Sequence, residues 1–349
     1  MSGDTTVIGV DVGGTKVSVA LMRDGVLAEP QLQATEQSDG DALVSQLGEL
    51  IAAELERASE PVIAVGIGIP SVIEWESGRV RASVNVPLRD VPLRDLLHDR
   101  LELPVYVDND ANCAALAEAH DDEGRLTVSE LVMLTVGTGV GGGIVSGGRI
   151  FHGATGGAAE LGHMIIGMNL EEDEVPPGGS FPVPGSLEHL AAGRALDHLA
   201  ARAAAAHPDS ALGRVLAREG RVAGPDAVSA AHAGDARAQE VIALLGHRLG
   251  VGIANAVNIF DPQVVAVGGG VSAAGELLIG PARESAQRFI LPGVGTRTQI
   301  RLARSGPQAG VRGAALLAGQ ESEHRNETTA TAAEQATAAA GDDHTGRAP

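Results

Sequence analysis

The sequence predicts an α/β protein with a duplicated fold and a ligand cleft between its two halves. One order of elements (strand, glycine-rich turn, strand, tight turn, strand) occurs near the N-terminus and again after residue 130. Helical and strand patterns alternate after each copy. The chain has 349 residues and is 44 % apolar, which allows about two domains with a sizeable core.

The first copy of this order lies within the first thirty residues. The apolar runs Val7–Val10 and Val17–Met22 predict two strands on either side of the turn Asp11–Lys16. A third short strand is expected at Val26-Leu27, after a tight turn at Asp24-Gly25.

The remainder of the first half alternates helix and strand. Apolar residues at helical spacing predict a helix over Ala42–Ala58, and the continuous apolar run Val62–Ile69 predicts a buried strand. A short strand, Val105–Val107, is followed by Asp108-Asn109-Asp110 and by a predicted helix over Ala111–Ala119.

The second copy begins with a strand at Leu131–Val136 and a turn at Gly137-Thr138-Gly139, followed by a strand at Gly143–Val145. Helices are expected from Leu187 to Ile259, and then a strand at Val264–Val267.

These elements predict an N-terminal domain, residues 1–118, and a larger C-terminal domain, residues 119–307. A helix at about 308–318 is expected to pack back on the first domain. Residues 320–349 contain no Val, Ile, Leu, Met or aromatic residue, so we expect a disordered tail there.

The composition excludes several classes of protein. The net charge of −20 argues against nucleic-acid binding, because phosphate contacts need clustered cations. The single cysteine, Cys113, excludes a disulfide framework and a multi-cysteine zinc site. The N-terminus lacks the basic segment of a signal peptide, and the uncharged run Leu131–Gly148 is too rich in glycine for a membrane helix. We therefore expect a cytoplasmic protein that binds no membrane.

Three glycine-rich turns follow apolar strands, at Asp11–Lys16, Gly137–Gly143 and Gly268–Gly270. Glycine allows close approach of the backbone and directs successive N–H groups at an anion. Any one turn is equally well a tight hairpin, whereas three at corresponding strand ends favour a phosphate-binding cleft. Asp11 is placed to hold a water of Mg²⁺ there, although an aspartate that only caps the turn would look the same. Lys16, the only lysine, adds a positive charge.

A dinucleotide-binding fold is disfavoured by sequence context. Gly137–Gly142 matches G-x-G-x-x-G, and Glu160 follows at about the required separation. A strand and a turn come next, where such a site needs a helix N-terminus. The phosphate-binding pattern G-x-x-x-x-G-K-[ST] is absent from the sequence.

Five segments, in order between Val7 and about Ala318, together resemble the ROK family of repressors, open reading frames and sugar kinases. Asp11-Val-Gly-Gly-Thr-Lys16 and Thr135-Val-Gly-Thr-Gly-Val-Gly-Gly-Gly143 resemble its two phosphate motifs, and Val267–Ser272 resembles its adenosine-side turn. Asp108–Ala115 is similar to the segment with the catalytic aspartate, and Gly157–His163 to the sugar-binding signature.

The resemblance implies a duplicated actin-like, ribonuclease-H-like ATPase fold and ATP-dependent phosphorylation of a hexose at its 6-hydroxyl, with glucose as the first choice. Asp110 would be the catalytic base, and the implied oligomer is a homodimer or homotetramer. The implied nucleotide- and Mg²⁺-binding residues are Asp11 (for Mg²⁺, through water), Gly13, Gly14, Thr15, Lys16, Gly137, Thr138, Gly139, Gly269 and Gly270. The implied sugar-binding residues are Asn85, Asn109, Asp110, Glu160, His163 and Glu188.

Other functions remain open within this resemblance. The substrate could be N-acetylmannosamine, fructose or allose, and the donor polyphosphate or ADP. A non-catalytic sugar-binding protein and a sugar-responsive repressor are further alternatives. Only ten residues precede Asp11, fewer than a DNA-binding module needs, which favours the enzyme.

One segment departs from the family pattern. Catalytic members usually carry a loop in which three cysteines and the signature histidine hold zinc. The matching stretch, Gly167–Glu188, has no cysteine, so no structural zinc is expected. Its acidic run, Glu171–Glu174, is typical of a solvated loop rather than a cation site. Ser71 stands where the family usually has glycine.

Overall fold

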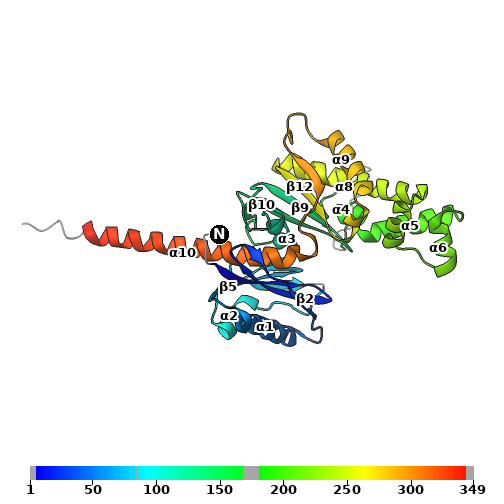
Figure 1. Ribbon diagram of the computed structural model, residues 1–349. Coiled ribbons are helices and arrows are strands. Elements are labelled where there is room, and N and C mark those ends of the chain that lie inside the picture. Colours follow the sequence, from blue (N-terminus) through cyan, green and yellow to red (C-terminus); the bar gives the residue numbers. More distant parts are fainter. Residues whose placement is uncertain (1–4, 84, 168–180, 343–349) are drawn as a thin grey trace, which may run out of the picture. The chain divides into compact units, whose positions relative to one another are not determined.

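Two sheets with equivalent strand orders form the framework of the computed structural model, which describes residues 5–83, 85–167 and 181–342 (Figure 1). The chain divides into two units. Unit 1 contains the described residues up to Asp110, residues 122–125 and the chain from Gly310 onwards; unit 2 contains residues 111–121 and 126–309.

Unit 1 is built on a six-stranded sheet in the order β3-β2-β1-β5-β8, with β4 also paired to β2. Its strands are β1 (Thr6–Val12), β2 (Lys16–Arg23), β3 (Val26–Leu27), β4 (Gln31–Ala34), β5 (Val62–Ile69) and β8 (Val105–Asn109). A separate hairpin joins β6 (Ser71–Glu74) to β7 (Arg79–Ser83), and the helices are α1 (Gly40–Arg57), α2 (Leu93–Leu101) and α10 (Ala309–Asp342).

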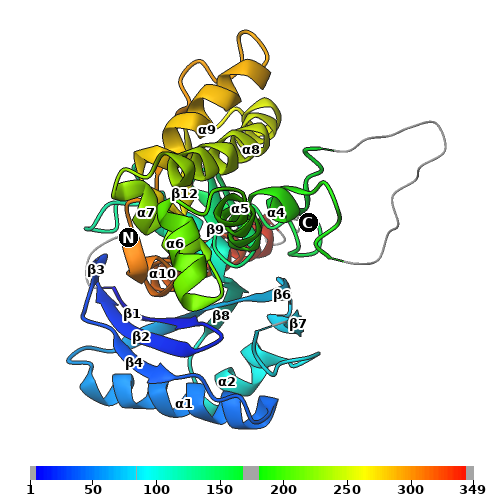
Figure 2. The same ribbon diagram turned by 90° about the vertical axis from the view of Figure 1, so that its right-hand side faces the viewer.

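Helices cover both faces of this sheet (Figure 2). Asp39 caps α1 by accepting a hydrogen bond from the Ala42 N–H at 2.8 Å, and the apolar side of α1 joins the buried core. On the other face α10 lies directly on β1 and β5, because a Cβ atom at Gly9 or Gly66 would clash with backbone carbonyls of α10.

Unit 2 repeats the arrangement in the order β11-β10-β9-β12-β13. In each unit the first three strands of this order pair antiparallel. The central strand, β1 or β9, then pairs in parallel with the fourth strand, and the fourth pairs in parallel with the fifth. The strands are β9 (Leu131–Val136), β10 (Val140–Ser146), β11 (Arg149–Ile150), β12 (Val264–Gly268) and β13 (Gln299–Leu302). The common topology confirms the duplicated α/β fold.

Helices make up most of the remainder of unit 2. They are α3 (Asp110–Glu118), α4 (Leu187–Ala191), α5 (Gly193–Ala206), α6 (Ala211–Glu219), α7 (Gly224–His232), α8 (Ala236–Phe260) and α9 (Glu276–Phe289), with short 3₁₀ turns η1 (Leu161–His163), η2 (Gly270–Ala274) and η3 (Gly306–Gln308). Within the described part of the chain, α8 alone is long and apolar enough to cross a membrane. It is a core helix, because it packs against α9 through Gly246 and Gly250, where added Cβ atoms would meet α9 backbone oxygens.

The structure corrects two boundaries. The chain enters unit 2 after Asp110, not at residue 118, because α3 packs against the glycines of β10: a Cβ at Gly143 would lie 2.7 Å from that of Ala115. The tail expected to be disordered from residue 320 begins instead inside α10, which continues to Asp342. Its alanine, glutamate and glutamine residues have high helix propensity even without apolar partners.

Candidate active site

Two aspartates lie at the same edge of the unit 1 sheet. The parallel strands β1, β5 and β8 align Asp11 with Gly68, and Gly68 with Asp108. Carboxyl ends of parallel strands meet at one edge, so Asp110, directly after β8, is on the same side as Asp11. The negative charge of Asp110 is close enough to raise the pKa of Asp11.

Asp11 is held in an environment that disfavours its charge. Burial raises its pKa to about 6; the neighbouring charge of Asp110 adds to this effect, and Lys16 opposes it. The start of α10 encloses the group, since a Cβ on Gly310 would lie 2.6 Å from both carboxylate oxygens. Two carboxylates crowded in this way are typical of functional sites, and in particular of sites for a hard cation.

The turn after Asp11 leaves backbone donors exposed. The Gly13 N–H donates to the Lys16 carbonyl at 2.9 Å, which closes the turn. The carbonyls of Gly13, Gly14 and Thr15 accept hydrogen bonds of 2.7, 2.7 and 3.1 Å from residues 35–37. The N–H groups of Gly14 and Thr15 donate to no acceptor among the described residues. The turn therefore presents unsatisfied donors and satisfied acceptors, as an anion site requires.

Unit 2 contains the equivalent turn between β9 and β10. The Gly137 N–H donates to the Gly139 carbonyl at 2.9 Å, and the Gly137 carbonyl accepts from the N–H of Gly193, the first residue of α5, at 2.7 Å. In the part of the chain that is described, Thr138 and Gly139 again keep N–H groups without an acceptor. The duplication thus extends to the hydrogen bonding of the two turns.

The third glycine turn follows β12 at the same edge of the unit 2 sheet, because β12 is parallel to β9 and aligns Gly268 with Thr135. Gly269 has a φ of +84°, and a Cβ there would lie 2.5 Å from the Val136 carbonyl oxygen. Glycine is therefore required by both conformation and space.

A cavity of about 690 Å³ in unit 2 adjoins these two turns. Gly137, Thr138 and Gly270 line it, as the sequence suggested for a nucleotide site. The other wall, where the starts of α5 and α7 converge, was not predicted from the sequence. That wall includes Gly193, Arg194, Asp197, Gly224, Pro225 and Ser229. The only sequence signal for it was a glycine at the first position of each helix.

Three predicted sugar-binding residues lie on adjacent elements of unit 2. The Nε2 atom of His163 is 3.7 Å from a carboxylate oxygen of Glu160, an exposed residue directly before η1. Glu188, in the first turn of α4, accepts a hydrogen bond of 2.9 Å from the Val140 N–H. A backbone hydrogen bond of 2.8 Å joins α4 to the end of η1.

The two asparagines predicted to bind sugar belong to unit 1. The Asn109 side-chain amide donates to the Ser71 carbonyl at 3.3 Å, and its backbone N–H donates to the Asp108 carboxylate at 2.7 Å. Asn85 adjoins the first phosphate turn, because a Cβ at Gly14 would lie 3.2 Å from the Asn85 carbonyl oxygen.

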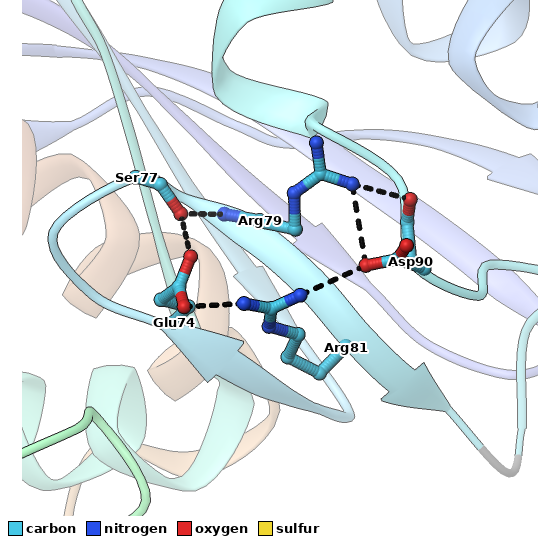
Figure 3. A network of polar contacts seen from close by, with 5 residues as sticks. All are labelled: Glu74, Ser77, Arg79, Arg81 and Asp90. Carbon is cyan, nitrogen blue, oxygen red and sulfur yellow. Dashed lines mark hydrogen bonds and ion pairs between the residues drawn. The ribbon is translucent and has the colours of Figure 1, made fainter.

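An ion-pair network that was not predicted from the sequence stabilises the β6–β7 hairpin just before Asn85 (Figure 3). Arg81 bridges Glu74 at 2.5 Å and Asp90 at 3.0 Å, and Arg79 lies 3.2 Å from Asp90. The network ties both ends of the segment that contains Asn85 to one hairpin.

The residues present do not fit the zinc site of the family. The sole cysteine, Cys113, is buried within α3. The Nδ1 atom of His163 is buried and has no hydrogen-bond partner among the described residues, and the His163 and Phe181 rings pack in a T-shaped arrangement with their centroids 5.1 Å apart. No group of three potential metal ligands occurs among the described residues. Glu171–Glu174 lie outside them.

Residues 7–321 match the protein family described as the ROK family. The chain is 35 % identical to a glucokinase of Halalkalibacterium halodurans, over 93 % of this chain and 99 % of the relative. It is 32 % identical to a xylose repressor of Caldicellulosiruptor bescii, over 80 % of this chain and 69 % of that protein.

The structure is similar to that of a ROK family glucokinase from Streptomyces griseus in complex with glucose and AMPPNP. The TM-score is 0.72 and the identity 34 %, covering 90 % of this chain and 99 % of that one. This similarity, with the repeated strand order, confirms the expected actin-like fold.

Proposed function

Because the chain belongs to the ROK family, we propose that it is an ATP-dependent kinase that phosphorylates glucose at the 6-hydroxyl. The observation that carries this proposal is the pair Asp11 and Asp110 at one sheet edge, beside a turn with unsatisfied N–H donors. Phosphoryl transfer needs these parts: a base for the alcohol, charge neutralisation and donors for phosphate oxygens.

In the proposed reaction, Asp110 accepts the proton of the 6-hydroxyl as that oxygen attacks the γ-phosphorus. A new P–O bond forms to the sugar, and the bond between the γ-phosphorus and the β,γ-bridging oxygen breaks. ADP leaves with the electron pair. The N–H groups of Gly14 and Thr15 are free to donate to phosphate oxygens, and Lys16 adds a positive charge.

Asp11 and its surroundings fit a magnesium ion. Its carboxylate is a hard oxygen donor with an unfavourable neighbouring charge, which a cation would relieve. We expect Asp11 to hold Mg²⁺ through a water molecule. When bound, the ion supplies neutralisation of the phosphate charge.

We assign the nucleoside to the 690 Å³ cavity of unit 2, a volume suited to a small-molecule ligand. Gly137, Thr138 and Gly270 line it, and Gly139 and Gly269 belong to the same two turns. For the sugar we propose Asn85, Asn109, Asp110, Glu160, His163 and Glu188. The glucose bound to the similar Streptomyces griseus enzyme supports glucose as the substrate.

We also propose that the enzyme works without structural zinc, as a cytoplasmic homodimer or homotetramer. In place of the metal, α4 is fixed by the hydrogen bond between Glu188 and Val140 and by its backbone link to η1. His163 keeps the aromatic contact with Phe181.

The test is a coupled assay of ADP formation with a panel of hexoses and N-acetylhexosamines, with Mg·ATP, with and without zinc. We expect the highest kcat/KM for glucose and no change when zinc is added. A higher value for N-acetylmannosamine, fructose or allose would replace glucose as the substrate. Sugar binding without turnover, with polyphosphate and ADP also tested as donors, would indicate a non-catalytic sugar-binding protein.

A further inference from the structure

A second cavity in unit 2, of about 490 Å³, lies among α4, α5 and α8 and is lined by three arginines and two histidines. Arg194, His198 and Arg202 occupy positions i, i+4 and i+8 of α5, and these positions lie on one side of a helix. Arg248 approaches from α8, and His189 approaches from α4. Side chains from three helices thus converge on one space.

The described residues do not neutralise the positive charges at this cavity. Among them, neither Arg194 nor Arg202 forms an ion pair, although the chain has 45 acidic residues and only 25 basic ones. Burial, and the nearby charge of Arg202, lower the pKa of Arg248. The arginines therefore repel one another, and a bound anion would remove that repulsion.

Some exposed arginines on other helices of this unit pair with carboxylates. Arg237 pairs with Glu240 at 2.8 Å, and Arg283 pairs with Glu276 at 2.8 Å. Among the described residues, the cationic cavity contains one carboxylate, that of Glu188, and this group already accepts the Val140 N–H. The arginines of the cavity thus differ from these paired arginines in having no carboxylate available to them.

Two side chains at the cavity are held in place by backbone hydrogen bonds. Arg248 donates to the Leu190 carbonyl at 3.1 Å, which joins α8 to α4. The Nδ1 atom of His189 accepts from the Gly185 N–H at 3.3 Å, so the neutral ring carries its proton on Nε2. The site therefore contains preorganised donors besides the exposed arginines of α5.

We propose that this cavity is a second anion site, which binds the phosphate group of inorganic phosphate or of a small phosphate monoester. Guanidinium groups bind phosphate through paired N–H donors, and three of them converge here. The site adjoins the proposed nucleoside cavity, with which it shares Thr138 and Arg194, but Arg202 and Arg248 line only the second cavity. Binding here does not depend on the proposed catalysis.

Calorimetric titration of the full chain, saturated with AMPPNP and at constant ionic strength, tests the proposal. Inorganic phosphate and glucose 6-phosphate are the two probes. The variants are Arg202→Ala, Arg202→Lys and Arg297→Ala; Arg297 is an exposed arginine of unit 2 that lines neither cavity. Circular dichroism checks that each variant folds.

We expect at least one probe to bind the wild-type chain, about tenfold or more weakly to Arg202→Ala, and with intermediate affinity to Arg202→Lys. Arg297→Ala should bind as the wild type does, and AMPPNP affinity should be unchanged in all variants. The probe whose affinity is lowered by Arg202→Ala identifies the source of the phosphate group, because glucose 6-phosphate also binds the proposed sugar site. The proposal is overturned if neither probe binds the wild type, or if Arg202→Ala binds as well as the wild type. Equal weakening by Arg297→Ala would also overturn it, because the effect would then be one of net charge.

Discussion

The equivalent glycine turns of the two units share a backbone and differ in the side chains around it. Each turn is closed by one internal hydrogen bond and leaves two N–H groups without acceptors within the described chain. In unit 1 the surrounding charges are Asp11, Asp110 and Lys16. In unit 2 the turn lies against the start of α5, which carries Arg194, and against the carboxylate of Glu188, which accepts the Val140 N–H at 2.9 Å.

This difference indicates how the two units of a duplicated fold can take different roles in one reaction. The repeated backbone supplies anion binding twice, because the donors belong to the main chain. Side chains then separate the roles: the carboxylates place the proposed phosphoryl chemistry in unit 1, while the cavity in unit 2 suits the nucleoside. Substitutions in each unit test this assignment of roles.

The largest effect is expected for Asp110→Asn. An amide cannot accept the proton of the sugar hydroxyl, so kcat should fall by a factor of about 10² to 10⁴. Glucose affinity, measured by calorimetry, should change little, because the amide keeps the shape of the side chain. The control is Asp95→Asn, an exposed position on α2. Near-normal turnover in Asp110→Asn would remove this residue from the mechanism and with it the assignment of chemistry to unit 1.

The second prediction is that the charged carboxylate of Asp11 lowers the free energy of unfolding. Its pKa in the folded state, about 6, lies above the ordinary value of 3.8, so the folded state holds its proton more tightly. Stability therefore falls as the pH rises from about 3.8 to 6, and the full cost, about 3 kcal/mol, applies above that range. In a metal-free buffer, Asp11→Asn should raise the free energy of unfolding by about this amount at pH 8, and by much less at pH 4.

Asp235 in unit 2 provides a control of opposite sign. Backbone N–H groups of Ala211 and Ala238 donate to it and lower its pKa. The charged carboxylate of Asp235 stabilises the folded protein at pH values above its pKa in the unfolded chain. This stabilisation is lost as the pH falls through its lower pKa in the folded protein. Asp235→Asn should therefore destabilise the protein at pH 8. Urea unfolding at pH 4 and pH 8 gives the free energy of unfolding of both variants. A lower free energy of unfolding for Asp11→Asn at pH 8 would contradict the conclusion that the charged carboxylate of Asp11 destabilises the folded state.

Most of the fold could be predicted because apolar periodicity reports burial. Some elements that escaped prediction lack that signal: all residues of β4 are exposed, and ion pairs join the strands of the β6–β7 hairpin. The helices α2 and α9 were also missed, although Leu93 and Leu97 in α2 and Leu278 in α9 are buried at helical spacing. The helical part of the tail after residue 320 was missed because helix propensity, rather than burial, favours it.

The site was predictable where it is made of glycine turns and their neighbouring carboxylates, since these are local in sequence. The wall of the cavity formed by α5 and α7 was not, because it exists only when two helix starts converge. The cationic face of α5 likewise becomes visible only when Arg248 of α8 is placed beside it. Tertiary contacts of this kind leave no pattern in a short window of sequence.

A third prediction separates two glycines of one segment in unit 2. A Cβ atom added at Gly142 would clash with the Ala159 carbonyl oxygen. A Cβ atom added at Gly137 would have no described atom within 4 Å. Gly142→Ala should therefore destabilise the protein by about 1–3 kcal/mol through overpacking. Gly137→Ala should keep its thermal stability, but raise the KM for ATP, because the new methyl group enters the proposed nucleoside cavity. An unchanged KM for ATP would argue against nucleoside binding in unit 2.

The smallest effect is expected at the hairpin network of unit 1 (Figure 3). Arg81 is exposed and bridges Glu74 and Asp90, so Arg81→Ala should lower thermal stability only slightly, and the difference should vanish in 1 M salt. Because the network fixes both ends of the segment containing Asn85, the KM for glucose should rise, though by less than about fivefold. Arg23→Ala is the matched control, since Arg23 pairs with Glu60 at a similar exposure elsewhere in unit 1. A rise in KM for ATP instead of glucose would show that the hairpin supports the phosphate turn beside Asn85 rather than the sugar.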